Sequence, residues 1–592
     1  MVESSKWEAA QLRIEGNAFH VLKHKDDLSA TWAELVSAFA SDVAVTCRMR
    51  EGSINKTLIR DPNARVGNLE WFLGEILKRA CEHAAALTCV IEADHVDSVY
   101  RDLYSSVYSH EFFDADRRAI RISIFADELN ERAFFIRPGR REHWDLTPVR
   151  EGSGPSLQDI FVGCVVAIPR CGGIVGRTLL DPRWLVNEPL AIRLSDYDIT
   201  VRGKRVSVQA FPFRGQDGEA MSCGETTIMS LLCYFSNEYG EYPITMPTEV
   251  LRTLSDAPSG RMLPSRGLDY EEVGKALAHA GLFPRSYHSD HMTVGVVPGE
   301  DATADSLMRK VAWTYVSSGI PVAVNVQSIV GRGLGVGHSL VLVGLGDESI
   351  EHVSLAKNEA AERITTPSGN PIRLIDAADL DVRRRFVVVD DTQVPYACRS
   401  WEELSAFRMM VPVELLVPTA RGMSLDAMDA RDIAGEILRS PKVGLSQGSG
   451  GLLDGSDLVL TQRMVSVRSY LRQRVSTCDE RIAYVWEGSS FPRWAWLFEC
   501  VSLSQWSKPA WERKAVSELL LDATSVTPGD PTSRVVLLRY PGFLHYHAPA
   551  GDGIVDTGDV PQEFVSYDCS LRHVGFEADS DAQSIGTEKE CS

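Results

Sequence analysis

Three polar side chains, each beside an apolar segment, have the types that thiol chemistry requires. Cys223 is the last residue but one of the stretch Q-D-G-E-A-M-S-C-G, which runs from Gln216 to Gly224. Apolar side chains then recur at the spacing of one buried helical face, at Ile228, Leu231, Leu232 and Phe235. The pattern predicts a helix that begins at Cys223. Unpaired N–H groups and the positive end of the helix dipole favour a thiolate over a thiol at that position.

A base and an orienting group for this thiolate lie further along the chain. His338 begins H-S-L-V-L-V, an apolar run bounded by glycines that indicates a buried strand. A second apolar strand, at residues 386–389, runs into Asp390 and Asp391. A histidine can take the thiol proton, and a carboxylate can hold the imidazole in the useful tautomer. Either aspartate can be this orienting group, because a register shift of one residue exchanges them. Both could equally be turn residues at a strand end.

These segments, over about residues 216–396, resemble the papain superfamily of cysteine peptidases. They are most similar to its bacterial branch of bacteriocin-processing, double-glycine-cleaving peptidases. The resemblance implies an α+β core in which a helix led by the cysteine packs on an antiparallel sheet. It implies that Cys223 is the nucleophile, His338 the base, Asp390 the orienting group, and Gln216 a hydrogen-bond donor to the oxyanion.

The sequence departs from the papain pattern in two places. Papain has a small residue and then an aromatic one around its cysteine, whereas Gly224, Glu225 and Thr226 follow here. The separation of His338 and Asp390 is long for two neighbouring strands, so we expect an insertion over about residues 347–385.

The predicted activity is hydrolysis of a peptide or isopeptide bond through an acyl-enzyme. The same three side chains would serve a deamidase or an acyltransferase equally well. A papain-like domain that had lost activity would instead be a binding or scaffold protein. All three residue types are present, which favours an enzyme over a scaffold and does not separate the enzyme classes.

Other chemistry-bearing patterns are weaker. Ser446 lies in G-L-S-Q-G, but that serine-hydrolase motif needs a strand before it and a helix after it, and glycines follow here. His545 with His547, and His288 with His291, could each contribute to a metal site, yet neither pair has a third ligand nearby. There is no H-E-x-x-H motif and no phosphate-binding loop. We therefore predict no cofactor and no metal.

The length of 592 residues predicts several domains, since single cores stop growing well below that size. We predict a mixed α/β accessory domain over residues 1–205, the papain-like catalytic domain over 206–400, a second accessory domain over 401–576, and a disordered tail over 577–592. The accessory domains would select a protein or peptide substrate or hold the site shut, and a regulatory protein partner would act through them.

Composition excludes several classes of function. A net charge of -20 argues against nucleic-acid binding, which relies on Lys and Arg to neutralise phosphates. No apolar stretch of about 18 residues is present to span a membrane, and the N-terminal residues lack the pattern of a secretory signal. Twelve cysteines without a C-x-x-C pair match reduced thiols. We therefore expect a cytoplasmic protein that binds neither nucleic acid nor membrane.

Apolar periodicity predicts further elements along the chain. Helices are expected over residues 71–87, 270–280, 302–318, 425–438 and 463–474. Strands are expected over residues 88–91, 119–125, 133–136, 161–168, 321–326, 338–343, 386–389, 481–486, 494–501 and 535–540.

Overall fold

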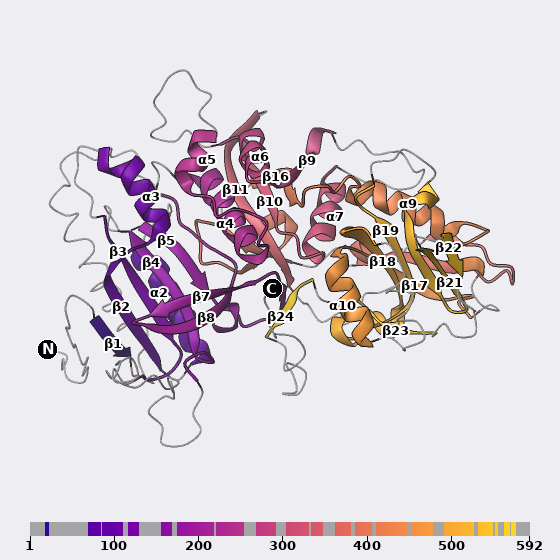
Figure 1. The fold of residues 1–592 in the computed structure, drawn as a ribbon, viewed down its shortest axis with the longest axis horizontal. Helices are drawn as coiled ribbons and strands as arrows, with labels where there is room; N and C mark the ends of the chain where they lie inside the picture. The colour runs from indigo at the N-terminus through magenta and orange to yellow at the C-terminus, as the bar shows by residue number, and fades with distance from the viewer. Residues whose placement is uncertain are drawn as a thin grey trace. The chain divides into compact units, whose positions relative to one another are not determined.

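The structure is a computed structural model of the whole chain. It describes residues 18–22, 69–84, 86–110, 117–129, 156–168, 174–217, 221–253, 268–291, 304–330, 333–346, 362–380, 385–404, 410–447, 452–477, 491–525, 531–548, 551–554, 562–568 and 570–575. These residues form a mixed α+β protein with several mainly antiparallel sheets (Figure 1). None of the described helices has the length and apolar character needed to cross a membrane.

The chain divides into two compact units. The first contains residues 1–215, 345–348 and 572–592, and the second contains residues 216–344 and 349–571. Every predicted catalytic residue belongs to the second unit. The domain boundaries at residues 205, 400 and 576 stay predictions.

The first unit is built on a five-stranded antiparallel sheet in which neighbours in sequence are neighbours in the sheet. Its strands are β1 (Ala18–Leu22), β2 (Leu87–His95), β3 (Ala119–Phe125), β4 (Phe161–Ile168) and β5 (Ile174–Leu180). The other elements are α2 (Leu69–His83), α3 (Ser98–Ser106), β6 (Leu190–Ile192) paired with β24 (Arg572–Val574), and the hairpin of β7 (Ser195–Val201) and β8 (Lys204–Ala210). The hairpin turns at Arg202 and Gly203, whose φ angles of 46° and 83° are those of a type I′ turn.

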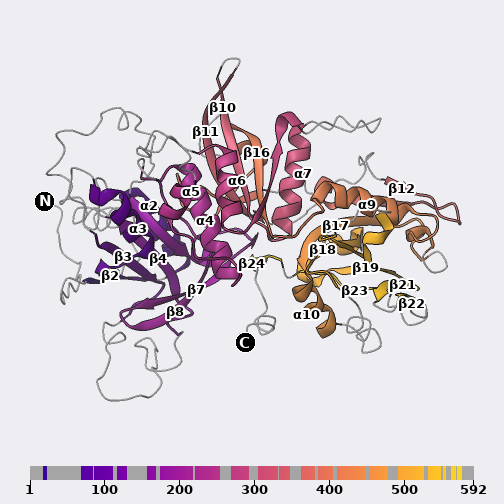
Figure 2. The same ribbon diagram turned by 45° about the horizontal axis from the view of Figure 1, so that its top comes forward.

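The second unit contains two sheets, and the first of them, here the site sheet, carries the predicted base. Its strand order is β15-β14-β11-β10-β16-β9. The strands are β9 (Phe283–His288), β10 (Val322–Val330), β11 (Gly333–Gly346), β14 (Phe386–Val389), β15 (Ala397–Arg399) and β16 (Met410–Thr419). The helices around it are α4 (Cys223–Glu238), α5 (Pro247–Thr253), α6 (Tyr270–His279) and α7 (Ala304–Ser317). Figure 2 shows α4, α5 and α6 on one side of this sheet and α7 on the other.

The second sheet of this unit, here the C-terminal sheet, has the order β12-β13-β17-β18-β19-β20-β21-β22, with β23 paired to β19. Its strands are β12 (Glu362–Ile364), β13 (Ile372–Asp376), β17 (Asp457–Ser466), β18 (Trp494–Ser502), β19 (Lys514–Asp522), β20 (Val535–Tyr540), β21 (Phe543–Ala548), β22 (Gly551–Ile554) and β23 (Phe564–Val565). Its helices are α8 (Ala377–Leu380), α9 (Ala427–Arg439), α10 (Val467–Thr477) and α12 (Leu503–Trp506). Strands β12 and β13 come from the expected insertion between His338 and Asp390, and they join this sheet.

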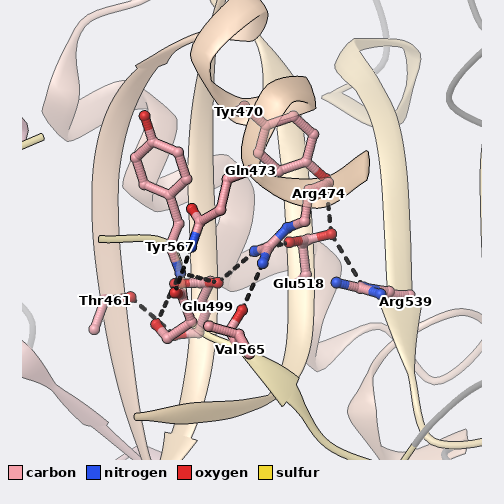
Figure 3. Close-up of polar contacts among 10 residues, drawn as sticks. Thr461, Tyr470, Gln473, Arg474, Glu499, Glu518, Arg539, Val565 and Tyr567 are labelled. Atoms are coloured by element: carbon pink, nitrogen blue, oxygen red, sulfur yellow. Dashed lines mark hydrogen bonds and ion pairs between the residues drawn. The ribbon is translucent and has the colours of Figure 1, made fainter. Parts of the chain in front are cut away.

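Four charged side chains are buried inside the C-terminal sheet (Figure 3). Arg474 of α10 lies 2.7 Å from Glu499 of β18 and also pairs with Glu518 of β19. Arg539 of β20 lies 3.1 Å from Glu518. Two cations and two anions balance one another, so the core holds charge without a net excess. Arg474 also donates to the carbonyl oxygen of Val565, which ties β23 to the centre of the sheet.

Most predicted elements agree with the structure, and four of the predicted strands have the observed bounds: β3, β4, β14 and β20. The helix predicted over residues 463–474 is wrong in its first four residues, which pair with β18 as the end of β17, and α10 begins at Val467. The helix predicted over 71–87 ends at His83, and Leu87 already belongs to β2. In both cases pairing with a neighbouring strand outweighs local periodicity. The strands predicted over 133–136 and 481–486, and the tail 577–592, lie outside the described residues.

Candidate active site

A capping box holds Cys223 at the start of α4. Cys223 is the first residue of the helix, and Ser222 is its N-cap. The backbone N–H of Ser222 donates to Glu225 Oε2 at 3.1 Å, and the Ser222 hydroxyl bonds to the same oxygen. These bonds satisfy polar groups that the helix end would otherwise leave unpaired. The half-buried thiol of Cys223 therefore lies at a fixed helix N-terminus.

Each of the three residues after the cysteine has a structural role that explains its type. A Cβ atom on Gly224 would lie 3.0 Å from Leu268 Cβ, so a larger residue would crowd the segment beside the helix. Glu225 closes the capping box. Thr226 donates its hydroxyl to Asp391 Oδ2 at 2.6 Å. The unusual G-E-T sequence thus meets three separate constraints in one helical turn.

His338 occupies the middle of the site sheet and bridges two partners. It lies in β11 opposite Val326 of β10, and only 4% of its surface is exposed. Its Nε2 donates to Asp390 Oδ1 at 2.9 Å, and its ring also hydrogen-bonds the Cys223 thiol. Because Nε2 faces Asp390, Nδ1 is the nitrogen left for the thiol. The structure thus brings Cys223, His338 and Asp390 together in the order that a nucleophile, a base and an orienting group require.

Asp390 is held in place independently of the histidine. It is the first residue after β14 and is fully buried. Its Oδ1 accepts the backbone N–H of Thr392 at 2.9 Å and the Thr392 hydroxyl at 2.7 Å. Its Oδ2 accepts from Gln393 Nε2 at 3.3 Å. The turn that follows β14 therefore fixes the carboxylate that receives the imidazole.

Asp391, the alternative orienting group, contacts other residues. Its Oδ1 lies 3.9 Å from His338 Nε2, beyond hydrogen-bond distance. The same oxygen accepts from Gln216 Nε2 at 2.8 Å, while Oδ2 accepts from Thr226. In this structure Asp390 is the carboxylate that is hydrogen-bonded to the imidazole, and Asp391 joins Gln216 to α4.

Two hydrogen bonds hold Asp217, the residue after Gln216, beside Met221, which lies two residues before Cys223. The backbone N–H of Asp217 donates to the carbonyl of Met221 at 3.1 Å, and the N–H of Met221 donates to Asp217 Oδ1 at 2.8 Å. These two bonds join the ends of the segment between Gln216 and Cys223. The side-chain amide of Gln216 is half-buried and bonded to Asp391.

Burial and neighbouring charges shift the pKa values of His338 and Asp390 in opposite directions. Burial disfavours the imidazolium of His338, but attraction to Asp390 and hydrogen bonds to Asp390 and Cys223 raise the pKa of His338 well above its ordinary value. Burial also opposes ionisation of Asp390, yet the charge of His338 and the Thr392 hydrogen bonds hold its pKa below the usual value. For Asp391, the effect of burial is larger than that of the His338 charge and of the hydrogen bonds from Thr226 and Gln216, and it raises the pKa to about 6. At neutral pH the Asp390–His338 pair is therefore ionic.

Four other thiols in the described part of the chain are suppressed as nucleophiles. Burial raises the pKa to about 12 for Cys81, Cys89 and Cys500, and to about 11 for Cys164. The thiolate is the reactive form, so these cysteines are nearly inert at neutral pH. Cys223, by contrast, hydrogen-bonds an imidazole.

The remaining sequence candidates do not form sites in the described residues. Ser446 lies in a short 3-10 turn (Leu445–Gln447) that follows a helix, not a strand, so it lacks the serine-hydrolase context. His545 lies in β21, and His288 Nδ1 accepts the backbone N–H of Asp290 at 3.2 Å. The side chains of His547 and His291 lie outside the described part.

Side-chain geometry within the described residues yields one group that could hold a metal ion, formed by His338, Asp390 and Asp391, with ligand atoms within 4.8 Å of one another. Each of these atoms already has a hydrogen-bond partner: Thr392 donates to Asp390, Gln216 donates to Asp391, and His338 donates to Asp390. N–H and O–H groups aimed at the oxygens match a hydrogen-bond network better than a cation site. We assign the group to the site of Cys223.

Sequence reasoning missed four of the residues that build the site. Thr392 had a signal, because an aspartate two residues before a hydroxyl residue often forms a local turn after a strand. The S-x-x-E pattern at Ser222 and Glu225 was likewise visible as a capping box. Thr226 had no such signal, because its partner Asp391 is distant in sequence.

No protein-family model matches the chain, and no curated protein matches its sequence.

Proposed function

We propose that the chain is a cysteine peptidase with a papain-like core, in which Cys223, His338 and Asp390 form the catalytic triad. One observation carries the proposal: the buried His338 ring hydrogen-bonds the Cys223 thiol, and its Nε2 lies 2.9 Å from Asp390. The three residues come from α4, β11 and the end of β14, which are distant in sequence. A helix led by the nucleophile beside an antiparallel sheet that carries the base supports the papain-like assignment.

In this proposal each step of acyl transfer is assigned to a residue of the triad. His338 Nδ1 takes the proton of the Cys223 thiol, and the thiolate attacks the acyl carbon of the substrate. The C–N bond then breaks as the imidazolium returns its proton to the leaving amine. Water, deprotonated by the same imidazole, releases the acyl group and restores the thiol. The pKa of His338 lies well above its ordinary value, so the ring holds its proton at neutral pH until the amine leaves.

The substrate oxygen becomes negative during the attack and needs donors. Cys223 is the first residue of α4, so its backbone N–H has no acceptor within the helix and can serve as one donor. The Gln216 amide, held beside α4 by Asp391, can serve as the other. Removal of one such donor typically lowers the rate by about 10²–10³-fold.

The cost of burial favours an enzyme over an inactive scaffold. Asp390 is 0% exposed and His338 is 4% exposed, and such a buried ion pair rarely repays its desolvation cost in stability. A scaffold would gain little by keeping it beside a thiol. A deamidase or an acyltransferase would use the same geometry, so the bond that is cleaved must be established by experiment.

A labelling experiment tests the nucleophile and its base. The full-length protein is treated with iodoacetamide at neutral pH, and the labelled cysteine is located by peptide mass spectrometry. We expect fast labelling at Cys223 that is lost in Cys223→Ala and slowed in His338→Ala. Cys233→Ala, which removes another half-buried thiol of α4, is the matched control and should label normally. Labelling that persists in Cys223→Ala, or that is unaffected in His338→Ala, would overturn the assignment.

A second experiment separates the enzyme classes. A peptide library is incubated with wild-type protein and with Cys223→Ala, and the products are identified by mass spectrometry. New N-termini that depend on Cys223 would establish a peptidase. Conversion of glutamine to glutamate without chain cleavage would establish a deamidase instead. A chelator added to both reactions should change neither result.

A further inference from the structure

We infer that Asp391 is a positioning residue that orients the Gln216 amide as the oxyanion donor. Two adjacent aspartates would then position two different groups of the site. This inference rests on the proposed function and adds a role that the triad does not contain. Asp390 holds the base, while Asp391 holds the donor to the negative oxygen. The argument depends on the contacts of Asp391 with Gln216, Thr226 and His338.

The contacts of Asp391 point to Gln216 and not to the base. Its Oδ1 accepts from Gln216 Nε2 at 2.8 Å but lies 3.9 Å from His338 Nε2. The second oxygen accepts the Thr226 hydroxyl at 2.6 Å. Asp391 is buried, so water does not compete strongly for these bonds. The carboxylate therefore connects Gln216 to the first turn of the helix that Cys223 begins.

An amide side chain needs such a partner to act as a directed donor. The Gln216 amide has two N–H groups on one end and a carbonyl oxygen on the other. One N–H bonds to Asp391, so the second is left for the substrate oxygen. If the amide turned over, its carbonyl oxygen would face the acceptor Asp391, which is unfavourable. The carboxylate thus selects the orientation in which the nitrogen end is in place.

Two small reagents separate this role from the function of the base. Iodoacetamide alkylates Cys223 by displacement of iodide, so its transition state has no oxyanion. Transfer of an acetyl group from p-nitrophenyl acetate to the thiol passes through a negative tetrahedral oxygen and releases p-nitrophenolate. The ratio of the acetylation rate to the alkylation rate therefore reports on the oxyanion donors. Rates are taken on the full-length protein after subtraction of the Cys223→Ala background.

We expect Gln216→Ala to lower the acetylation rate by about 10²-fold and to leave alkylation nearly unchanged. Asp391→Ala should lower acetylation by about 10-fold or more, since misplacing a catalytic group by about 1 Å can cost about 10²-fold. Asp391→Asn should recover most of this loss, because its carbonyl oxygen can still accept from Gln216. The double variant with Ala at both positions should be no slower than Gln216→Ala alone.

Several outcomes would overturn the inference. Losses that multiply in the double variant would show that Asp391 does not act through Gln216. A loss in Asp391→Ala that is equal for alkylation and acetylation would place Asp391 on the base. Faster acetylation in Asp391→Ala would show that Asp391 withholds the amide from the site. Thr226→Val, which keeps the side-chain shape, provides a second test if Asp391→Ala does not fold, and it should lower acetylation but not alkylation.

Failure of the proposed function gives a different result. If wild-type Cys223 is alkylated no faster than in His338→Ala, the triad assignment fails, and the inference fails with it. If alkylation is fast and depends on His338 but the acetylation ratio does not respond to Asp391, only the inference fails.

Discussion

Replacement of Asp390 by Asn should slow the thiol chemistry far less than replacement by Ala. Asp390 Oδ1 accepts two donors from Thr392, at 2.9 and 2.7 Å, as well as His338 Nε2 at 2.9 Å. The Thr392 donors require an acceptor at this position, so the Asn side chain should place its carbonyl oxygen there. That oxygen still accepts from the imidazole. Asp390→Asn thus removes the charge but keeps the hydrogen bond and the tautomer.

The size of the effect follows from the charge that is lost. Two unit charges about 4 Å apart attract by about 4 kcal/mol at an effective dielectric constant of about 20. Removal of the buried charge also removes its desolvation cost, so we expect a net loss of about 2–3 kcal/mol, or about 10²-fold in rate. Asp390→Ala also loses the bond that orients the ring, and its loss should reach about 10³–10⁴-fold.

The assay is the rate of Cys223 alkylation by iodoacetamide as a function of pH. The reactivity of the Cys223 thiolate changes where its partner His338 gives up its proton, and Asp390 raises the pKa of His338. Both variants should therefore shift this upper step of the profile to lower pH. Equal losses in Asp390→Asn and Asp390→Ala, or an upper step that does not move, would refute the reasoning.

Three further predictions concern stability. Burial raises the pKa of Asp391 from 3.8 to about 6. The protonated carboxyl therefore contributes fully to the free energy of unfolding below pH 3.8, and this contribution is lost as the pH rises through 6. Asp391→Asn should raise the free energy of unfolding by about 2 kcal/mol at pH 8 but not at pH 4, as measured by urea titration. Glu518→Gln should lower the free energy of unfolding by about 3–5 kcal/mol, because it leaves buried guanidinium charge uncompensated. Its control, Glu402→Gln in an exposed pair, should lower it by less than about 1 kcal/mol, and similar losses in both would contradict the argument. Ser222→Ala should lower the melting temperature and cost about 1 kcal/mol through the lost N-cap, whereas Ser222→Thr should not.

The elements of the site were predictable because each depends on a local pattern. The apolar face after Cys223 and the four buried residues of β14 depend only on the spacing of side chains that contact the core. The bounds of α10 were not predictable from spacing, because residues 463–466 pair with Trp494–Leu497 of β18. A strand of this kind is determined by its neighbour, and the neighbour is distant in sequence.

Strand order was the least predictable feature of the fold. β16 lies beside β10 in the site sheet, although the segment that forms it follows β14 and β15 in the chain. β13, from the insertion between His338 and Asp390, pairs in parallel with β17 of the C-terminal sheet. The apolar pattern of a strand does not predict which strand it pairs with, because buried strands of similar composition could pair in several orders.

The division of work between the two aspartates depends on the register of β14. Successive side chains at a strand end diverge, so Asp390 meets His338 while Asp391 meets Gln216. A shift of one residue would exchange the two roles and disrupt both sets of hydrogen bonds. The register is held by the buried side chains of β14 and by the bond from the Tyr396 N–H to the Val388 carbonyl at 3.0 Å. The base and the oxyanion donor therefore share one structural support, and a cavity in β14 would disturb both together although neither aspartate is changed.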